Sequence, residues 1–280
     1  MASSDLNKAN EGKKDEFYTQ LVDIQAELKH YEKHFKGKVV FCNCDDACGS
    51  DFFKYFALNF NYLGLKKLIA TCYRGSPFSD KQLSIFGILP KESEDSKKAY
   101  KIEISEVRDI YGEGLVDFTD VAYLLRNRKN ILTFLDGDGD FRSEECVEML
   151  KETDIICTAP PLSLFREFVA QLMKYKKYFL IIGNVSVLWC KKINSLIKSN
   201  EIWLGCSIHS GDREFLVPDD YPFETAGYRV DEQGRKYIRV KGVRWFTNLD
   251  CVESHTDFDF GKTYASQEYL KRIIKKLTIL

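Results

Sequence analysis

Residues 154–165 (DIICTAPPLSLF) join an apolar segment to a Pro-Pro turn. Proline cannot donate a hydrogen bond to a sheet ladder and it restricts the backbone, so this segment predicts a strand that ends in a rigid turn. Open α/β sheets bind their ligands beyond the carboxyl ends of their strands. The residues of the turn are therefore candidate site residues: Ala159, Pro160, Pro161 and Leu162.

A second candidate site follows the apolar segment KVVFCNC, which ends at Cys44. The next residues, DDACGSDFF, place two carboxylates and Gly49 before a predicted helix. Carboxylates bind hydroxyl groups or a positive group, and glycine permits close backbone approach, so this turn suits a nucleoside cofactor. A purely structural turn is the alternative interpretation.

Hydrophobic periodicity predicts the elements that position these turns. Apolar residues three and four apart indicate helices, and short apolar runs indicate buried strands. The expected helices are 15–35, 51–63, 117–128, 143–151, 163–175 and 190–198; the expected strands are 38–44, 66–72, 99–104, 130–135, 154–158, 178–182 and 202–205; a polar loop is expected over 74–98. The strand, turn, helix and strand over 38–72 form a βαβ unit, which predicts an α/β fold with a parallel sheet.

The sequence also predicts a domain organisation. Residues 1–14 are polar and are expected to form a flexible tail, followed by a domain over 15–212. The pattern of 213–280 becomes hairpin-like, with a turn at 232–235, and we expect this region to pack on the same domain. Its last part, 266–280, has the pattern of a basic amphipathic helix. That helix could dock on the core or contact a partner or a DNA backbone.

The composition indicates a globular and nearly neutral protein. The 280 residues are 44% hydrophobic and 30% charged, and the formal net charge is −1. This balance neither supports nor excludes nucleic acid as a partner, because a local basic face would suffice. Nine scattered cysteines without a signal peptide predict free thiols in a reducing compartment. No apolar run approaches the ~20 residues of a membrane span. We therefore expect a cytoplasmic protein (nuclear if eukaryotic) that is not secreted and contacts no membrane.

Three further patterns could suggest a metal or phosphate site, and each departs from the pattern it suggests. The DGDGDF run that begins at Asp136 lacks the sixth-position glycine and the twelfth-position glutamate of a calcium loop. The cysteines within 42–48 match no common zinc spacing. The GKT tripeptide at 261–263 lacks the earlier glycine of a phosphate loop. We therefore expect no metal ion.

Several segments together resemble the EcoRI-type adenine-specific DNA methyltransferase family. The turn after Cys44 is similar to the Asp-Pro-x-x-Gly-x-Gly turn of S-adenosylmethionine-dependent methyltransferases, with Ala47 and Asp51 replacing the proline and the second glycine. The Pro-Pro turn is similar to the motif Asn-Pro-Pro-Phe, with Ala159 and Leu162 at its ends. The matching stretches are 15–20, 42–46, 52–56, 63–71, 137–143, 163–173, 179–184 and 243–249.

The resemblance implies a Rossmann-like methyltransferase sheet with helices on both faces, a C-terminal β-hairpin region and S-adenosylmethionine as the cofactor. The implied cofactor-binding residues are Phe17, Tyr18, Thr19, Asn43, Asp45, Asp46, Gly49, Asp140 and Phe141. The Phe-Tyr-Thr segment would contact the methionine end of the cofactor. Asp140 would accept a hydrogen bond from the adenine amino group, and Phe141 would stack on the adenine ring.

The resemblance also implies a reaction on double-stranded DNA. The family transfers a methyl group to adenine N6, and the target base must leave the duplex to reach the cofactor. The asparagine oxygen and the carbonyl of the first proline hold the amine in line with the methyl group, so catalysis is mostly positioning. The implied catalytic residues here are Ala159, Pro160, Pro161 and Leu162.

The departures at Ala159 and Leu162 leave three hypotheses open. The first is an active adenine-N6 DNA methyltransferase with a relaxed motif. The second is a catalytically degenerate member that binds DNA or pairs with a partner methyltransferase subunit. The third is methylation of another amine, in RNA or protein, because a pocket without the asparagine could suit a different nucleophile.

Overall fold

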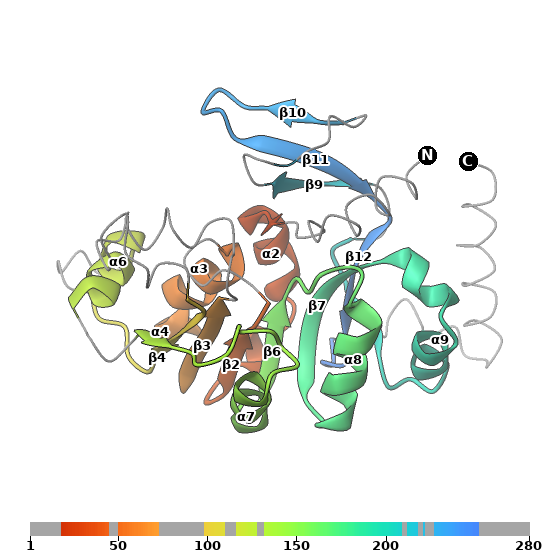
Figure 1. Ribbon diagram of the computed structural model, residues 1–280, viewed down its shortest axis with the longest axis horizontal. Coiled ribbons are helices and arrows are strands. Elements are labelled where there is room, and N and C mark those ends of the chain that lie inside the picture. The colour runs from red at the N-terminus through yellow and green to blue at the C-terminus, as the bar shows by residue number, and fades with distance from the viewer. Residues whose placement is uncertain are drawn as a thin grey trace.

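The computed structural model describes residues 18–44, 50–72, 98–109, 116–127, 132–208, 212–217, 221 and 227–251 (Figure 1). Several predicted features lie outside these residues. They are the tail over 1–14, Phe17, the turn residues Asp45, Asp46 and Gly49, almost all of the loop over 74–98, and the helix over 266–280.

An eight-stranded mixed sheet forms the centre of the fold, in the order β5-β4-β3-β2-β6-β7-β12-β8. In chain order the strands are β2 (Val39–Cys42), β3 (Lys67–Cys72), β4 (Tyr100–Ile104), β5 (Leu132–Phe134), β6 (Ile155–Thr158), β7 (Tyr178–Asn184), β8 (Trp203–Leu204) and β12 (Val243–Thr247). The central strands β3, β2, β6 and β7 are parallel. Each end of the sheet continues with antiparallel pairs.

Helices cover both faces of this sheet (Figure 1). One layer holds α2 (Leu21–Leu28), α3 (Asp51–Leu58), α4 (Phe60–Leu63) and α6 (Phe118–Asn127). The other holds α7 (Glu144–Glu152), α8 (Phe165–Lys174) and α9 (Lys191–Lys198), and short 3-10 turns are η1 (Glu32–His34) and η3 (Val185–Trp189). Among the helices in the described ranges, none is long and apolar enough to cross a bilayer.

The four parallel strands β2, β3, β6 and β7 each contribute to two separate cores. In β2, Val40 and Cys42 pack in the core beneath α3, whereas Val39 and Phe41 pack in the core beneath α8. Side chains alternate between the two faces of a strand, so an uninterrupted apolar run fits a sheet that is covered on both sides. The predicted α/β fold with helices on both faces is thereby confirmed.

The predicted βαβ unit is also present. Ser50 caps α3 by accepting a hydrogen bond from the backbone N–H of Phe52 at 3.1 Å. The aromatic side chains of α3, among them Phe52 and Phe56, are buried against the sheet. Strands β2 and β3 then pair in parallel, with Val40 opposite Leu68.

A second, four-stranded sheet stands above the carboxyl edge of the central sheet in Figure 1. Its order is β1 (Tyr18–Thr19), β9 (Asp212–Val217), β11 (Lys236–Lys241) and β10 (Arg229–Val230). The predicted hairpin turn at 232–235 joins β10 to β11, with Gly234 at φ 78°. A single residue, Gly242 at φ 72°, separates β11 from β12 of the central sheet. The proposed division of the chain at residue 212 stays a prediction.

Two helix predictions were wrong in extent. The helix expected over 15–35 contains the strand β1 before α2 and ends at Leu28, and a 3-10 turn follows. The helix expected over 51–63 is divided at Asn59 into α3 and α4. In both places the apolar spacing continues although the helical hydrogen bonding does not, so periodicity alone joined separate elements.

A buried carboxylate ties α2 to the segment after β8. Glu27 is 0% exposed, and its Oε1 accepts hydrogen bonds from the Tyr31 hydroxyl at 2.9 Å and the Cys206 N–H at 2.7 Å. Its Oε2 accepts from the Ser207 N–H at 2.6 Å. A Cβ on Gly205 would collide with this carboxylate, so glycine is required there. Glu27 therefore provides hydrogen-bond acceptors for backbone N–H groups of a loop that has no regular secondary structure.

Candidate active site

The two predicted turns lie next to each other at the carboxyl edge of the central sheet. Strands β2 and β6 are parallel neighbours, with Val40 opposite Ile155, so they end at the same edge. The hydroxyl of Thr158, the last residue of β6, donates a hydrogen bond to the carbonyl of Asn43, the first residue after β2. This contact links the candidate cofactor turn to the Pro-Pro turn.

Burial and a backbone hydrogen bond hold the Pro-Pro turn in place. Pro160 is buried, whereas Ala159 and Leu162 are half-buried. The carbonyl of Pro161 accepts the backbone N–H of Leu164 at 2.9 Å, which closes the turn before α8 begins. Cys157, two residues before Ala159, is completely buried, and burial raises the pKa of its thiol well above the ordinary value. The cysteine is therefore a neutral core residue and not a nucleophile.

A glycine in β7 positions the helix that follows the turn. A Cβ on Gly183 would lie 2.8 Å from Cζ of Phe165, because the phenyl ring packs directly on the strand. Phe165 is the first residue of α8 and is fully buried against Phe246. The lack of a side chain at Gly183 thus allows α8, and the turn before it, to approach the sheet closely.

We expect Gly183→Ala to lower the stability of the fold by about 1–3 kcal/mol, because the new methyl group overpacks the Phe165 ring. Thermal unfolding followed by circular dichroism would measure this loss. Adding Phe165→Leu to the variant should restore part of the stability, because the smaller side chain makes room for the methyl group. An unfolding temperature unchanged by Gly183→Ala would contradict this account of the contact.

Asn43 supplies an unpaired polar group at the candidate cofactor turn. The side chain is 1% exposed, and its Oδ1 accepts a hydrogen bond from the Cys44 thiol at 3.0 Å. Its Nδ2 has no hydrogen-bond partner in the described structure. A buried donor without an acceptor is costly, so this atom fits a site that a ligand completes. The role of Asn43 in cofactor binding remains a prediction.

The described part of the Phe-Tyr-Thr segment lies close to the same turn. Tyr18 and Thr19 form β1, and Thr19 is buried with an Oγ1 that has no hydrogen-bond partner among the described residues. Shortly after β1, the N–H of Leu21 donates to Oδ2 of Asp51 at 3.0 Å. Asp51 begins α3, directly behind the candidate cofactor turn, so the structure brings these two predicted segments together.

The structure places Asp140 and Phe141 in other contacts. Both carboxylate oxygens of Asp140 accept hydrogen bonds from the Arg142 guanidinium, at 2.8 and 2.6 Å, and these bonds lower the pKa of Asp140. Phe141 is 4% exposed, and its ring packs edge to face on Phe168 at 5.1 Å. Asp140 would have to share its carboxylate, and Phe141 would have to turn, to contact adenine. Both roles therefore stay predictions.

Three residues at this edge make structural contacts that the sequence analysis did not predict. Thr158 joins the two turns, Asp51 holds the segment after β1, and Asn184 caps η3 by accepting the Ser186 N–H at 2.9 Å. Asn184 also donates to the Lys241 carbonyl at 2.6 Å, which fixes the second sheet to the end of β7. An asparagine directly after an apolar strand is a capping signal, so this residue could have been found.

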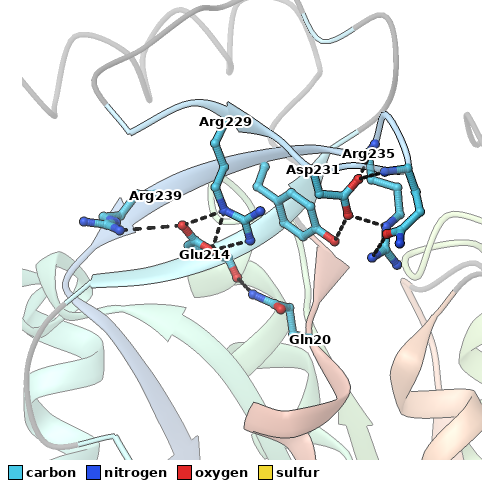
Figure 2. Close-up of polar contacts among 8 residues, drawn as sticks. Gln20, Glu214, Arg229, Asp231, Arg235 and Arg239 are labelled. Atoms are coloured by element: carbon cyan, nitrogen blue, oxygen red, sulfur yellow. Dashed lines mark hydrogen bonds and ion pairs between the residues drawn. The ribbon is translucent and has the colours of Figure 1, made fainter.

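Figure 2 shows that the second sheet neutralises much of its own charge. Glu214 accepts hydrogen bonds from Arg229, the shortest at 2.8 Å, and forms an ion pair with Arg239 at 3.6 Å. Asp231 pairs with Arg235 at 2.7 Å. The Gln20 side chain donates to the Glu214 carbonyl at 2.9 Å, which connects the residue after β1 to β9. Arg229, Arg235 and Arg239 are therefore structural partners of the acidic residues of this sheet.

No cluster of three or more His, Cys, Asp or Glu side chains suited to a metal ion is found within the described ranges.

Comparison with known proteins gives consistent matches along the chain. The sequence model of the family described as "Adenine-specific methyltransferase EcoRI" matches residues 5–272. The chain is 43% identical over 265 residues to the Type II methyltransferase M.EcoRI of Escherichia coli, which covers 94% of this chain and 74% of that protein. No solved structure gives a significant match.

Two relatives from mycoplasmas are more distant. The Type II methyltransferase M.MpnI of Mycoplasma pneumoniae is 32% identical and M.MgeORF184P of Mycoplasma genitalium is 30% identical, each over 247 residues. These matches cover 87% of this chain but 64% of each relative, so the chain spans less than two thirds of their length.

The family match extends over both candidate turns and both sheets, and the resemblance expected from the sequence motifs is confirmed. The chain belongs to the adenine-specific methyltransferase EcoRI family.

Proposed function

We propose that the chain transfers a methyl group from S-adenosylmethionine to N6 of an adenine in double-stranded DNA. The observation that carries this proposal is the link between Asn43 and the Pro-Pro turn through the Thr158 hydroxyl. A cofactor at the end of β2 and a base at the end of β6 would be immediate neighbours, as a transfer controlled by positioning requires. The family description and the names of the relatives support the adenine and the methyl transfer.

Groups at the end of β2 and in β1 fit the proposed cofactor. S-adenosylmethionine supplies a reactive methyl group on a positively charged sulfur. The unpaired Nδ2 of Asn43 and the unpaired Oγ1 of Thr19 offer buried polar atoms that a ligand could satisfy. Tyr18 and Asp140 belong to the same proposed site through the family motifs, as do Phe17, Asp45, Asp46, Gly49 and Phe141.

The proposed catalytic turn keeps one of its two amine acceptors. The Pro160 carbonyl would accept a hydrogen bond from the adenine amine, whereas Ala159 has no side-chain acceptor. Loss of one group that stabilises a transition state lowers the rate by about 10²–10³. Leu162 would cover the flipped base without aromatic stacking, which is worth ~1–3 kcal/mol per base. Slow transfer by the unmodified chain is the expected consequence.

The same two residues favour a second candidate function. A catalytically degenerate member would keep the fold and the cofactor edge and would bind DNA or pair with an active methyltransferase subunit. Ala159 and Leu162 are the observations that favour it. This candidate differs from the first in predicting no methyl transfer by the isolated chain.

Titration calorimetry with S-adenosylmethionine, followed by transfer of a labelled methyl group to DNA, tests both candidates. We expect micromolar cofactor binding and slow transfer to DNA. Binding without transfer would support the degenerate candidate. Transfer to RNA or protein, with none to DNA, would overturn both.

We expect Asn43→Asp to weaken cofactor binding about tenfold, because the change removes the unpaired Nδ2 donor at almost constant shape. The same calorimetric titration would measure the loss. The thermal unfolding of the variant without cofactor serves as the control for the fold. Unchanged affinity would show that Asn43 is not a cofactor ligand.

A further inference from the structure

An exposed tryptophan lies at the same edge of the sheet as the Pro-Pro turn. Trp189 is 66% exposed and ends η3, the turn between β7 and α9 in Figure 1. Strand β7 runs parallel to β6, with Thr158 opposite Ile181, so η3 leaves the edge beside the turn that follows β6. An exposed indole next to positive charges can stack on a nucleic-acid base.

Folding does not require the indole to face outward. Val185 and Leu188 bury their side chains and hold η3 on the core, and the side chain of Asn184 caps its start. The other tryptophans in the described ranges behave differently: Trp245 is completely buried, and Trp203 is half-buried and donates to the Leu249 carbonyl at 3.1 Å. The exposure of Trp189 therefore reflects its position and not a loosely packed region.

Three positively charged side chains lie near Trp189. Lys191 and Lys192 are exposed in the first turn of α9, and Arg166 is exposed in the first turn of α8. The backbone N–H groups of Ile193 and Lys192, and then the Arg166 guanidinium, lower the pKa of the Cys190 thiol. Arg166 therefore lies close to Cys190, the residue that follows Trp189. We call Arg166, Trp189, Lys191 and Lys192 the Trp189 patch.

The positive charges of the Trp189 patch do not stabilise the fold. Lysines in the first turn of a helix oppose the positive end of the helix dipole, and α9 has no acidic residue there. None of the three cations forms an ion pair with a residue in the described ranges. By contrast, Arg229, Arg235 and Arg239 of the second sheet are paired with Glu214 and Asp231 (Figure 2). The Trp189 patch thus offers the stronger attraction for an anionic partner.

We propose that the Trp189 patch binds the DNA beside the target base, and this inference rests on the proposed function. Lys191, Lys192 and Arg166 contact phosphates, which fix the position of a duplex without reading its sequence. The indole of Trp189 packs on a base next to the site from which the adenine leaves. The patch lies at the edge that carries the Pro-Pro turn, so one duplex can contact both.

Binding of the full chain to a fluorescein-labelled DNA duplex of mixed sequence, followed by anisotropy at several salt concentrations, tests the inference. We expect Lys191→Gln with Lys192→Gln to reduce the slope of log K against log salt by about two, since each phosphate contact contributes about 0.9. We expect Trp189→Ala to weaken binding by about 5- to 100-fold. Trp189→Phe should retain much of the affinity.

Matched controls come from the opposite edge of the sheet. Tyr178 is 53% exposed at the start of β7, so Tyr178→Ala removes an exposed aromatic far from the turn. Lys176→Gln with Lys198→Gln removes two positive charges near the same edge. These controls should bind the duplex like the unmodified chain.

The outcomes separate this inference from the proposed function. If the unmodified chain binds the duplex and the variants of the Trp189 patch bind equally well, the inference is wrong and the proposed function stands. If the unmodified chain binds no duplex, both fail. Preferential binding of an RNA duplex by the patch would also overturn the inference.

Discussion

The double variant Ala159→Asn with Leu162→Phe is expected to transfer methyl groups to DNA at least about a hundredfold faster than the unmodified chain. The asparagine restores an acceptor for the adenine amine, and one such group contributes about 10²–10³ to a rate. The phenylalanine restores stacking on the flipped base. Transfer of a labelled methyl group to duplex DNA at saturating cofactor would measure the increase.

The structure gives a physical reason to expect both side chains to reach the site. Thr158, the residue before Ala159, is held against the cofactor turn by its hydrogen bond to the Asn43 carbonyl, and the closed turn after Pro161 holds Leu162. Both positions are only half-buried, so larger side chains have room toward the solvent. Ala159→Leu is the matched control, because it adds a side chain of similar size without an acceptor. A double variant no faster than this control would show that the turn is not the catalytic element.

Glu27→Ala is expected to destabilise the fold by about 3 kcal/mol or more. The change removes the carboxylate acceptor of one buried and two half-buried donors, and a buried donor left without its acceptor costs about 1–3 kcal/mol. These donors are the Tyr31 hydroxyl and the N–H groups of Cys206 and Ser207. Burial, and then the neighbouring Glu27 carboxylate, raise the pKa of Tyr31, so its hydroxyl remains a donor. Urea unfolding followed by fluorescence would measure the loss.

Two further variants test whether the loss of stability in Glu27→Ala comes from the hydrogen bonds of Glu27. Glu27→Gln keeps one acceptor oxygen and should destabilise the fold less than Glu27→Ala. Glu152→Ala removes an exposed carboxylate at the end of α7 and should change the stability by no more than about 0.5 kcal/mol. Equal losses for Glu27→Ala and Glu152→Ala would mean that the buried hydrogen bonds contribute little.

The central sheet was predictable from the sequence because its signals are local. The strand over 38–44, the capped helix that begins at Asp51 and the strand over 66–72 each carry their own apolar pattern. The reversed direction of β4, which pairs antiparallel with both β3 and β5, was not predictable, because an apolar run does not state its direction. The short strand β1 was missed because two residues show no periodicity and its partner is distant in the sequence.

The candidate site was predictable in part. Motifs placed Asn43 and Ala159 at strand ends, and the strand order of the structure brings those ends together. The same motifs could not show that Phe141 packs on Phe168, because burial depends on the opposite helix. The contacts of Glu27 and Trp189 were also beyond motif analysis, since they depend on loops and charges that only the fold brings together.

The pairing of β1 with β9 has a consequence for biosynthesis. The residue that follows β1, Gln20, bonds to Glu214 across 194 positions of the chain. At about 5–20 residues per second, a ribosome needs roughly 10–40 s to make that interval. During this time Tyr18 and Thr19 have no partner strand, so the segment proposed to hold the cofactor is completed only when most of the chain has been made. Emerging chains should therefore remain unable to take up the cofactor until translation is nearly finished.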